Sequence, residues 1–426
     1  MKKSAISYLI LGLILALSQA VPARADFVIG GTQSGWQLST NGIVDVFATY
    51  KTTSAAPGGD RFLTLLGGGA SNSQNFDVTV GLLPSVVGFT VKAPTMNGID
   101  SSVHIGIYPS IQNKTKNRFE TSPNIDFREI YYKAKGNFGE LLAGRALNLY
   151  QSKNILTDMT LLTAGVVPAP GTTTTLGHIG YGYLYTDFGP QLRYTTPSFA
   201  GANFALSVNE PYDVSSQGGD KTSTPRVEAE ISYATILGGG ATLQGWLDGL
   251  YQSATMTVGS LDGHHVHSAG GAAGVEGGFH GISLLASGYY GEGLGMISAQ
   301  DGSAFTTTMR DADGNITKQF GSPTDAVGKE RTQFGFLVQA TYQLLPSTKV
   351  GVNYGQNSQL ASDNDEATNY TGGIPMKRQE AATAMVAYNL TKSIQFVGEY
   401  SYAQNKWYDG NTQHSHSFDI GTMYYW

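Results

Sequence analysis

Residues 124–150, NIDFREIYYKAKGNFGELLAGRALNLY, predict two strands joined by a tight turn at Gly136-Asn137. The regular pattern then stops for roughly 40 residues, an interruption that a compact domain rarely carries without a function. It resumes at residues 190–208, PQLRYTTPSFAGANFALSV. A solvated linker carries fewer apolar residues than this interruption, so we expect the interruption to pack against the rest of the protein. Its apolar residues are Leu147, Leu149, Tyr150, Ile155, Leu156, Met159, Leu161, Leu162, Tyr181, Tyr183 and Tyr185.

Apolar and polar side chains alternate through most of the remaining chain. In residues 36–50, Val44, Val46, Ala48 and Tyr50 share one face of a predicted strand, and the opposite face carries Asp45 and Thr49. The same alternation recurs in residues 350–355, 394–402 and 418–426. Residues 75–94 also read as a strand, whose pairing we expect to be interrupted at Pro84.

Short turns alternate with long polar connections along the chain. The predicted turns lie at residues 97–98, 136–137, 237–240, 277–281, 344–348 and 389–393. The other connections, such as 51–74, 293–329 and 356–376, are longer. This asymmetry is typical of an outer-membrane barrel with short periplasmic turns, and the number of strand-like runs predicts about sixteen strands.

The order of features around the interruption resembles the general bacterial porins. These features are a strand, the turn Gly136-Asn137-Phe138-Gly139, a second strand ending in Ala143-Gly144-Arg145, a long segment, and the run from Leu192 to Gly201. The resemblance implies an all-β fold, a transmembrane antiparallel barrel of sixteen strands whose long third loop, here residues 146–188, folds into the lumen. It also implies a homotrimer in contact with outer-membrane lipid, through which ions and small hydrophilic solutes diffuse. The family usually ends in Phe, whereas this chain ends in Trp426, which we expect to close the barrel against the first strand.

The first 25 residues predict a secretory signal peptide. Lys2 and Lys3 precede an apolar core at residues 8–17, and small residues stand at Ala23 and Ala25. An uncleaved anchor is the alternative, but the apolar core is shorter than a membrane span. The barrel domain would therefore occupy residues 26–426. Removal of Lys2, Lys3 and Arg24 lowers the formal charge from −6 to −9, which argues against a nucleic-acid partner.

The composition fits a wall that faces lipid. The chain has no cysteine, which excludes a disulfide scaffold and thiol chemistry. Charged residues make up 14% of the chain, below the roughly 25% of ordinary soluble domains. The 24 tyrosines suit the aromatic girdles of a barrel, and the Gly, Ser, Gln, Asn and Thr of the polar face suit a water-filled lumen. Periodicity alone leaves a soluble β-sandwich open, because its strands alternate equally well.

Five charged residues are candidates for a pore constriction. Arg193 alternates with Leu192 and Tyr194, which places it on the polar face, and the resemblance implies that Arg145 and Arg193 both project into the lumen. Asp158 and Asp187 lie within the interruption and are predicted to oppose them. Arg128 is a further candidate on the wall.

Other motifs give weaker indications. Residues 311–315, DADGN, resemble the start of a calcium loop, but Pro323 stands where the closing Glu is expected. The histidines at positions 264, 265, 267, 414 and 416 are more simply explained as loop residues at a rim than as metal ligands. No Gly-x-Ser-x-Gly, His-Glu-x-x-His or phosphate-binding glycine loop occurs, so we expect neither an enzyme nor a cofactor. An exported carbohydrate-binding or adhesive β-protein and a barrel enzyme remain as alternatives.

Overall fold

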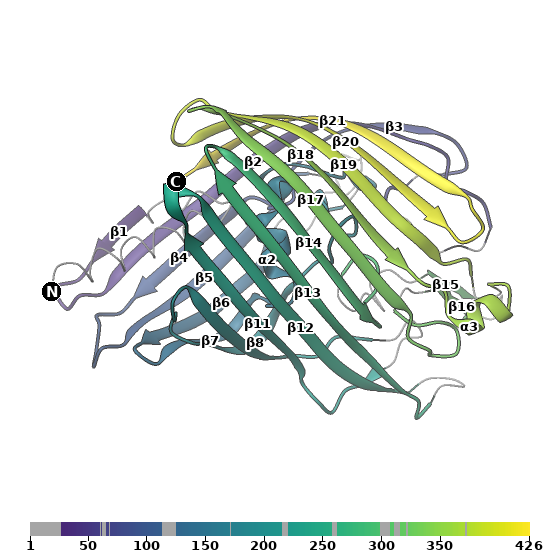
Figure 1. Ribbon diagram of the computed structural model, residues 1–426, viewed down its shortest axis with the longest axis horizontal. Coiled ribbons are helices and arrows are strands. Elements are labelled where there is room, and N and C mark those ends of the chain that lie inside the picture. The colour runs from purple at the N-terminus through teal and green to yellow at the C-terminus, as the bar shows by residue number, and fades with distance from the viewer. Residues whose placement is uncertain are drawn as a thin grey trace.

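The chain forms a closed antiparallel barrel with sixteen strand positions (Figure 1). The computed structural model describes residues 27–59, 61, 65–67, 69–112, 125–170, 172–214, 220–257, 262–298, 307–310, 316–320, 323–370 and 373–426. The predicted signal peptide and the calcium-like residues 311–315 lie outside these ranges. No helix in the described part of the chain is long and apolar enough to span a membrane.

Neighbouring positions in the ring are filled by strands that follow one another in sequence. Two positions hold a broken strand, β3 with β4 and β10 with β11, while β1 adds to the edge of β2. In order, the strands are β1 (Phe27–Gly31), β2 (Gln37–Thr53), β3 (Ser73–Thr79), β4 (Val86–Lys92), β5 (Asp100–Pro109), β6 (Ile125–Gly136), β7 (Gly139–Leu147), β8 (Phe188–Thr195), β9 (Ala202–Asn209), β10 (Asp220–Lys221), β11 (Arg226–Ile236), β12 (Thr242–Met256), β13 (His265–Phe279), β14 (Ile282–Glu292), β17 (Thr332–Leu345), β18 (Thr348–Gln359), β19 (Met376–Asn389), β20 (Ile394–Trp407) and β21 (Thr412–Tyr425). Outside the ring lie the hairpin of β15 (Thr307–Arg310) and β16 (Ile316–Phe320), and helix α3 (Asp363–Ala367).

The first and last strands of the ring close the barrel. β2 pairs with β21 from Ile43 opposite Tyr425 to Thr53 opposite Ser415. Beyond the ladder, Gly42 and Trp426 exchange two backbone hydrogen bonds of 3.2 Å. The predicted closure of the C-terminal strand against the first strand is therefore confirmed.

Pro84 lies in the break between β3 and β4, as expected from the missing N–H of proline. Both pieces pair with β2, β3 along Phe47–Thr53 and β4 along Gln37–Ile43. The predicted interruption of this strand is confirmed. The loop predicted at 51–74 is shorter, because β2 continues to Thr53 and β3 begins at Ser73.

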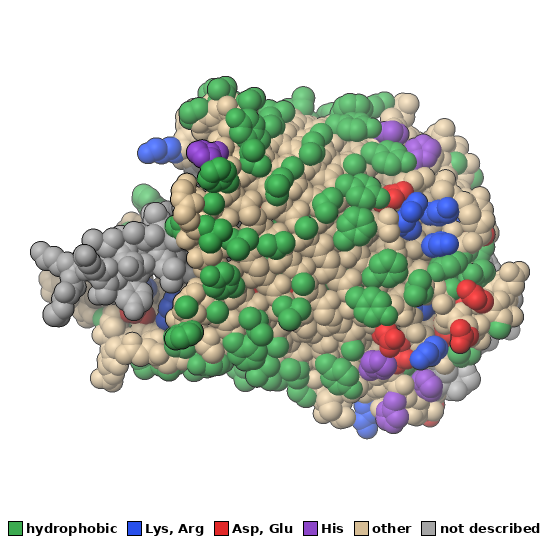
Figure 2. All heavy atoms as spheres, viewed as in Figure 1, with side chains coloured by type: hydrophobic (Ala, Val, Ile, Leu, Met, Phe, Trp, Pro, Cys, Tyr) green, Lys and Arg blue, Asp and Glu red, His purple; other side chains and the backbone are tan. Residues whose placement is uncertain are grey.

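The two faces of the wall differ in polarity. On β21, Ile420 is 72% exposed, whereas its neighbour Asp419 is 1% exposed. On β2, Val44 and Tyr50 are exposed, whereas Asp45 and Lys51 are buried. Figure 2 shows the apolar side chains spread across the outside of the barrel. The apolar face is thus the outer one, as a barrel in lipid requires and as a soluble sandwich does not.

Candidate functional site

The segment 148–187, between β7 and β8, is a folded unit that packs against the wall. It contains α2 (Ser152–Thr157) and the short 3-10 helix η1 (Met159–Leu162). Tyr150, Tyr181 and Tyr183 are 0% exposed, and Leu149, Ile155 and Leu161 are also buried. The expectation that the interruption packs against the protein is confirmed.

Asp158 is the centre of a hydrogen-bond network inside this segment. Its carboxylate accepts hydrogen bonds from the backbone N and Oγ1 of Thr160 at 2.9 and 2.6 Å, from Tyr183 Oη at 2.7 Å, from His178 N at 3.3 Å and from Asn353 Nδ2 at 3.2 Å. The residue is 0% exposed. This placement differs from the prediction that Asp158 faces the wall arginines, because its carboxylate is used to fix the fold of the segment.

Polar side chains of the buried wall face hold the segment along its length. Gln339 accepts a hydrogen bond from Met159 N at 2.6 Å and donates to the carbonyl of Thr157 at 3.1 Å. Glu399 accepts hydrogen bonds from Thr163 Oγ1 and Gly165 N, both at 2.5 Å. Wall side chains that bond to the segment are Lys51 of β2, Gln191 of β8, Asn209 of β9, Glu228 of β11, Trp246 of β12, Gln339 of β17, Asn353 and Asn357 of β18, Thr383 of β19, and Glu399 and Asn405 of β20.

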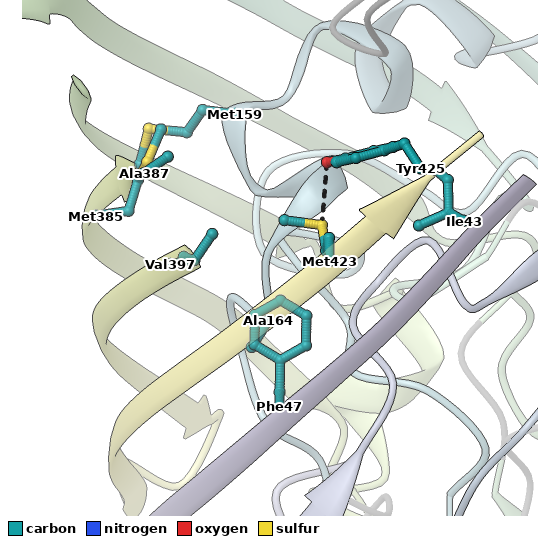
Figure 3. Packing of buried hydrophobic residues seen from close by; sticks show 9 residues of the cluster. All are labelled: Ile43, Phe47, Met159, Ala164, Met385, Ala387, Val397, Met423 and Tyr425. Atoms are coloured by element: carbon teal, nitrogen blue, oxygen red, sulfur yellow. Dashed lines mark hydrogen bonds between the residues drawn. The ribbon is translucent and has the colours of Figure 1, made fainter. Parts of the chain in front are cut away.

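Apolar packing joins the same segment to the closing seam (Figure 3). Met159 and Ala164 of the segment belong to one buried cluster with Phe47 of β2, Met385 of β19 and Met423 of β21. Burial of such side chains stabilises by about 1.5–3 kcal/mol each. The segment is therefore packed against β2, β19, β20 and β21 at the seam.

Lys51 connects three chain segments. Its ammonium donates to the carbonyls of Leu66, Val167 and Pro168 at 3.0, 3.0 and 2.5 Å, and the residue is 2% exposed. All three ammonium protons thus find an acceptor, which is what a buried lysine needs. The sequence analysis assigned Lys51 to the loop at residues 51–74, so it predicted neither the position of Lys51 in β2 nor its partners.

A cavity of about 590 Å³ borders the segment, and Arg128 and Asp187 both line it. Tyr185 and Tyr212 also line it. Burial and the nearby carboxylate of Asp187 raise the pKa of Tyr212 to about 12. The structure therefore brings together two of the predicted constriction residues, the basic Arg128 and the acidic Asp187, in one cavity.

A β-bulge turns Arg128 toward this cavity. In the pairing of β5 with β6, Gly106 lies opposite Glu129 and Ile107 opposite Phe127, so Arg128 is the extra residue. Phe127 and Ile130 are exposed on the outer face, which leaves both Arg128 and Glu129 facing inward. The Arg128 guanidinium lies 5.3 Å from the centre of the Tyr108 ring, and Tyr108 Oη donates to Glu129 at 2.6 Å.

Arg193 lines a second cavity, of about 430 Å³, with Glu129. It lies opposite Leu142 of β7 and Ser207 of β9, both buried, so its predicted position on the inner face agrees with the register. Sequence reasoning missed the other charged residues of this cavity. They are Glu129, Lys133 and Glu140 on the wall, Glu230 of β11 and Lys153 of α2.

Arg145 does not join either cavity. It pairs with Ile130, which is 54% exposed, and with Pro190, so its side chain is on the outer face. Its Nη1 donates to the carbonyl of Phe188 at 2.5 Å. This placement differs from the prediction that Arg145 projects into the lumen with Arg193.

The predicted rim histidines lie partly in strands. His265 and His267 belong to β13, and His414 and His416 belong to β21, whereas His264 lies in a loop. His267 is 2.8 Å from Glu330, and Tyr400 Oη is 2.8 Å from His416 Nδ1. Among the residues that the structure describes, no three His, Asp or Glu side chains are grouped so that they could hold a metal ion.

Comparison with known proteins gives one family and several related folds. A family model described as Gram-negative porin matches residues 12–408. The outer membrane channel DcaP of Acinetobacter baumannii is 17% identical, with a TM-score of 0.65 over 93% of this chain and 99% of that chain. An anion-selective porin from Comamonas acidovorans is 13% identical, with a TM-score of 0.60 over 92% and 100%. OmpT of Vibrio cholerae is 12% identical, with a TM-score of 0.53 over 93% and 100%. No curated protein sequence matches.

Proposed function

Because the chain belongs to the Gram-negative porin family, it is an outer-membrane channel for solutes, and we propose that the segment 148–187 lies in its lumen and forms the constriction. The observation that carries this proposal is the ring of hydrogen-bond partners. Side chains from nine strands, β2, β8, β9, β11, β12, β17, β18, β19 and β20, bond to the segment from the buried face of the wall. A segment that bonds to strands on several sides of a closed barrel can reach all of them most directly from inside the barrel.

We infer that solutes pass along the wall formed by β5–β9 and β11. The smaller cavity lies between the segment and the strands β6–β9 and β11, and Arg128 of β6 lines the larger cavity. Adjacent inward-facing residues link them, since Arg128 lines the larger cavity and Glu129 the smaller one. Arg128, Asp187 and Arg193 would then be among the charges that a permeating ion passes.

Ion selectivity in planar bilayers tests this assignment. Charges a few ångströms from an ion in a partly screened passage contribute about 1 kcal/mol or more, roughly fivefold in permeability ratio. We expect Arg128→Gln with Arg193→Gln to shift the reversal potential toward cations, and Asp187→Asn to shift it toward anions. Arg145→Gln is the control, because it removes one arginine charge from the outer face. A reversal potential that responds to Arg145→Gln but not to the other variants would contradict the proposed path.

Two further proposals concern the mature protein. We propose a homotrimer, supported by the family and by the similar fold of a trimer form of Vibrio cholerae OmpT, which is 12% identical with a TM-score of 0.51 over 92% of this chain and 99% of that chain. We also propose that residues 1–25 are removed on export. Native mass spectrometry of protein extracted from outer membranes tests both, because three copies of a chain beginning at Asp26 have a defined mass. A monomer or an uncleaved chain would contradict the corresponding proposal.

A further inference from the structure

The larger cavity is lined by residues that lie far apart in the sequence. Arg128 comes from β6, and Tyr185 and Asp187 come from the end of the segment 148–187. Residues 211–213 follow β9, and residues 297–298 follow β14. The volume of about 590 Å³ is within the range of sites that bind small organic molecules.

Much of the lining of this cavity is apolar. Its aliphatic residues are Leu65, Leu82, Pro168, Leu176, Ile179 and Ile297. The aromatic rings of Tyr185 and Tyr212 add to this surface. Apolar and aromatic side chains favour a solute that removes its own apolar surface from water. The cavity therefore suits a solute with an apolar body.

The ring of Tyr212 is fixed by its surroundings. Tyr212 N donates to Gln252 Oε1 at 3.0 Å, and Gln252 Nε2 donates to the Tyr212 carbonyl. The Arg226 guanidinium lies 4.7 Å from the centre of the ring, and Asn148 Nδ2 donates to Tyr212 Oη at 3.4 Å. A solute that contacts this ring does not have to order it first, which favours affinity.

The charges around the cavity are predominantly negative. Arg128 pairs with Asp126, 2.7 Å from Nε to Oδ2. Asp187 and Asp213 also line the cavity, and neither has an ion-pair partner among the residues that the structure describes. One cation and three carboxylates leave an excess of two negative charges. Such an excess attracts cations and repels anions.

We propose that the larger cavity binds organic cations, which are solutes with an apolar body and an ammonium group. The body would contact the aliphatic and tyrosine side chains, and the ammonium would lie near Asp187 and Asp213. An inorganic cation would use the carboxylates but not the apolar lining, and an uncharged apolar solute would use the lining but not the carboxylates. This inference rests on the proposed function, because solutes would reach the cavity through the lumen.

Calorimetric titration of the detergent-purified protein with phenethylammonium tests the inference. We expect the variant Asp187→Asn/Asp213→Asn to bind about tenfold more weakly, because it loses both unpaired charges. Asn tolerates the left-handed backbone of residue 187, where φ is 63°. The matched control, Asp262→Asn/Asp363→Asn, removes the same charge from exposed sites outside the cavity and should bind as the parent does.

Two analogues identify which features of the solute are recognised. The anion 3-phenylpropionate and the small cation ethylammonium should each bind the parent about tenfold or more weakly than phenethylammonium, since one reverses the charge and the other lacks the ring. Equal binding by the double variant or by 3-phenylpropionate would overturn the inference. Equal binding by ethylammonium would overturn it in favour of a simple cation site. Heat-modifiable migration of each variant in gel electrophoresis verifies that the barrel is folded.

Single-channel recording separates this inference from the proposed path. Phenethylammonium should lower the conductance of the parent and have less effect on Asp187→Asn/Asp213→Asn. Calorimetric binding without any effect on conductance would support the cavity as a binding site and contradict the placement of the segment in the lumen. A reversal potential that shifts in Asp187→Asn, without calorimetric binding to the parent, would overturn the inference alone.

Discussion

At the seam of the barrel, Gly42 leaves the space that the indole ring of Trp426 fills. A Cβ atom built on Gly42 would lie 2.2 Å from a ring carbon of Trp426 and 2.6 Å from the carbonyl oxygen of Val86. The neighbouring backbone is fixed by pairing with both β4 and β21, so it has little freedom to move away. The packing of the Trp426 ring therefore requires a residue without a side chain at position 42.

We expect Gly42→Ala to destabilise the barrel by about 1–3 kcal/mol, the range of an overpacked core. The measurement is the urea midpoint for loss of heat-modifiable migration in reconstituted protein. Gly398→Ala is the control, because the added methyl group meets no atom within 4 Å and should change stability by less than about 0.5 kcal/mol. Equal midpoints for the two variants would show that the ring and Gly42 are not tightly packed.

Local backbone irregularities decide for which arginines the sequence correctly predicts the face of the wall. Arg193 lies in a regular strand, so its alternation with Leu192 gave the correct face. At Arg128 a bulge adds one residue, and two successive side chains, Arg128 and Glu129, face inward. Arg145 follows Gly144, whose φ of 133° is accessible to glycine but rare for other residues. The strand-pairing partner of Arg145, Ile130, places the arginine on the outer face. A bulge changes the parity of a strand without leaving a signal in hydrophobic periodicity.

At the scale of elements, helix α3 is attached to the neighbouring loop by one buried ion pair. Arg331, just before β17, contacts Asp365 of α3 through Nε and Nη2, both at 2.8 Å. The two side chains are 3% and 7% exposed. Ser362 caps α3 and donates to Asp325 at 2.5 Å, which adds a second connection.

The ion pair makes the attachment of α3 dependent on pH. Burial opposes ionisation, but the Arg331 guanidinium outweighs it and holds the pKa of Asp365 below its ordinary value. The resulting stabilisation is complete above the unfolded pKa of about 3.9 and is lost as the pH falls through the lower folded pKa. We expect hydrogen exchange in residues 361–368 to be slow at pH 5–7 and to accelerate, relative to intrinsic rates, below about pH 4.

Asp365→Asn provides the corresponding test at neutral pH. Loss of the carboxylate removes the negative charge that compensates the buried guanidinium of Arg331, so local stability should fall by about 3 kcal/mol and the pH response should disappear. Asp363→Asn is the control, because Asp363 is exposed in the same helix. Unchanged exchange in Asp365→Asn would assign the attachment of α3 to the Ser362 contacts alone.

The segment 148–187 shows why an element can be recognised without its position being known. Its length and apolar residues predicted that it packs, and burial confirms this. Its partners are distant in sequence, however. Asp158 bonds to Asn353, 195 positions away, and Thr163 bonds to Glu399, 236 positions away. No local sequence pattern encodes such long-range pairs. The sequence therefore could not show that the carboxylate of Asp158 is occupied by hydrogen bonds rather than facing the arginines.

For the whole molecule, the closed ladder forms its backbone hydrogen bonds without the segment 148–187. Every strand position has hydrogen-bonded neighbours on both sides, ending with β21 against β2. We therefore expect a variant with residues 154–175 shortened to keep heat-modifiable migration while its single-channel conductance rises and its solute size limit widens. Planar-bilayer recordings and liposome swelling with sugars of graded size measure the two effects. A variant of parental conductance and size limit would show that the constriction lies elsewhere.

The pairing of β2 with β21 also governs when folding can finish. These strands begin 375 positions apart, at Gln37 and Thr412. Contacts between residues so distant in sequence form slowly, because the chain loses the entropy of closing the loop before the contacts contribute any stabilisation. A growing chain cannot complete the ring until its final strand has been synthesised. Until then β2 has an unpaired edge, which is a template for aggregation. Chaperone protection must therefore outlast translation, and chains truncated before Thr412 should be substrates for proteolysis.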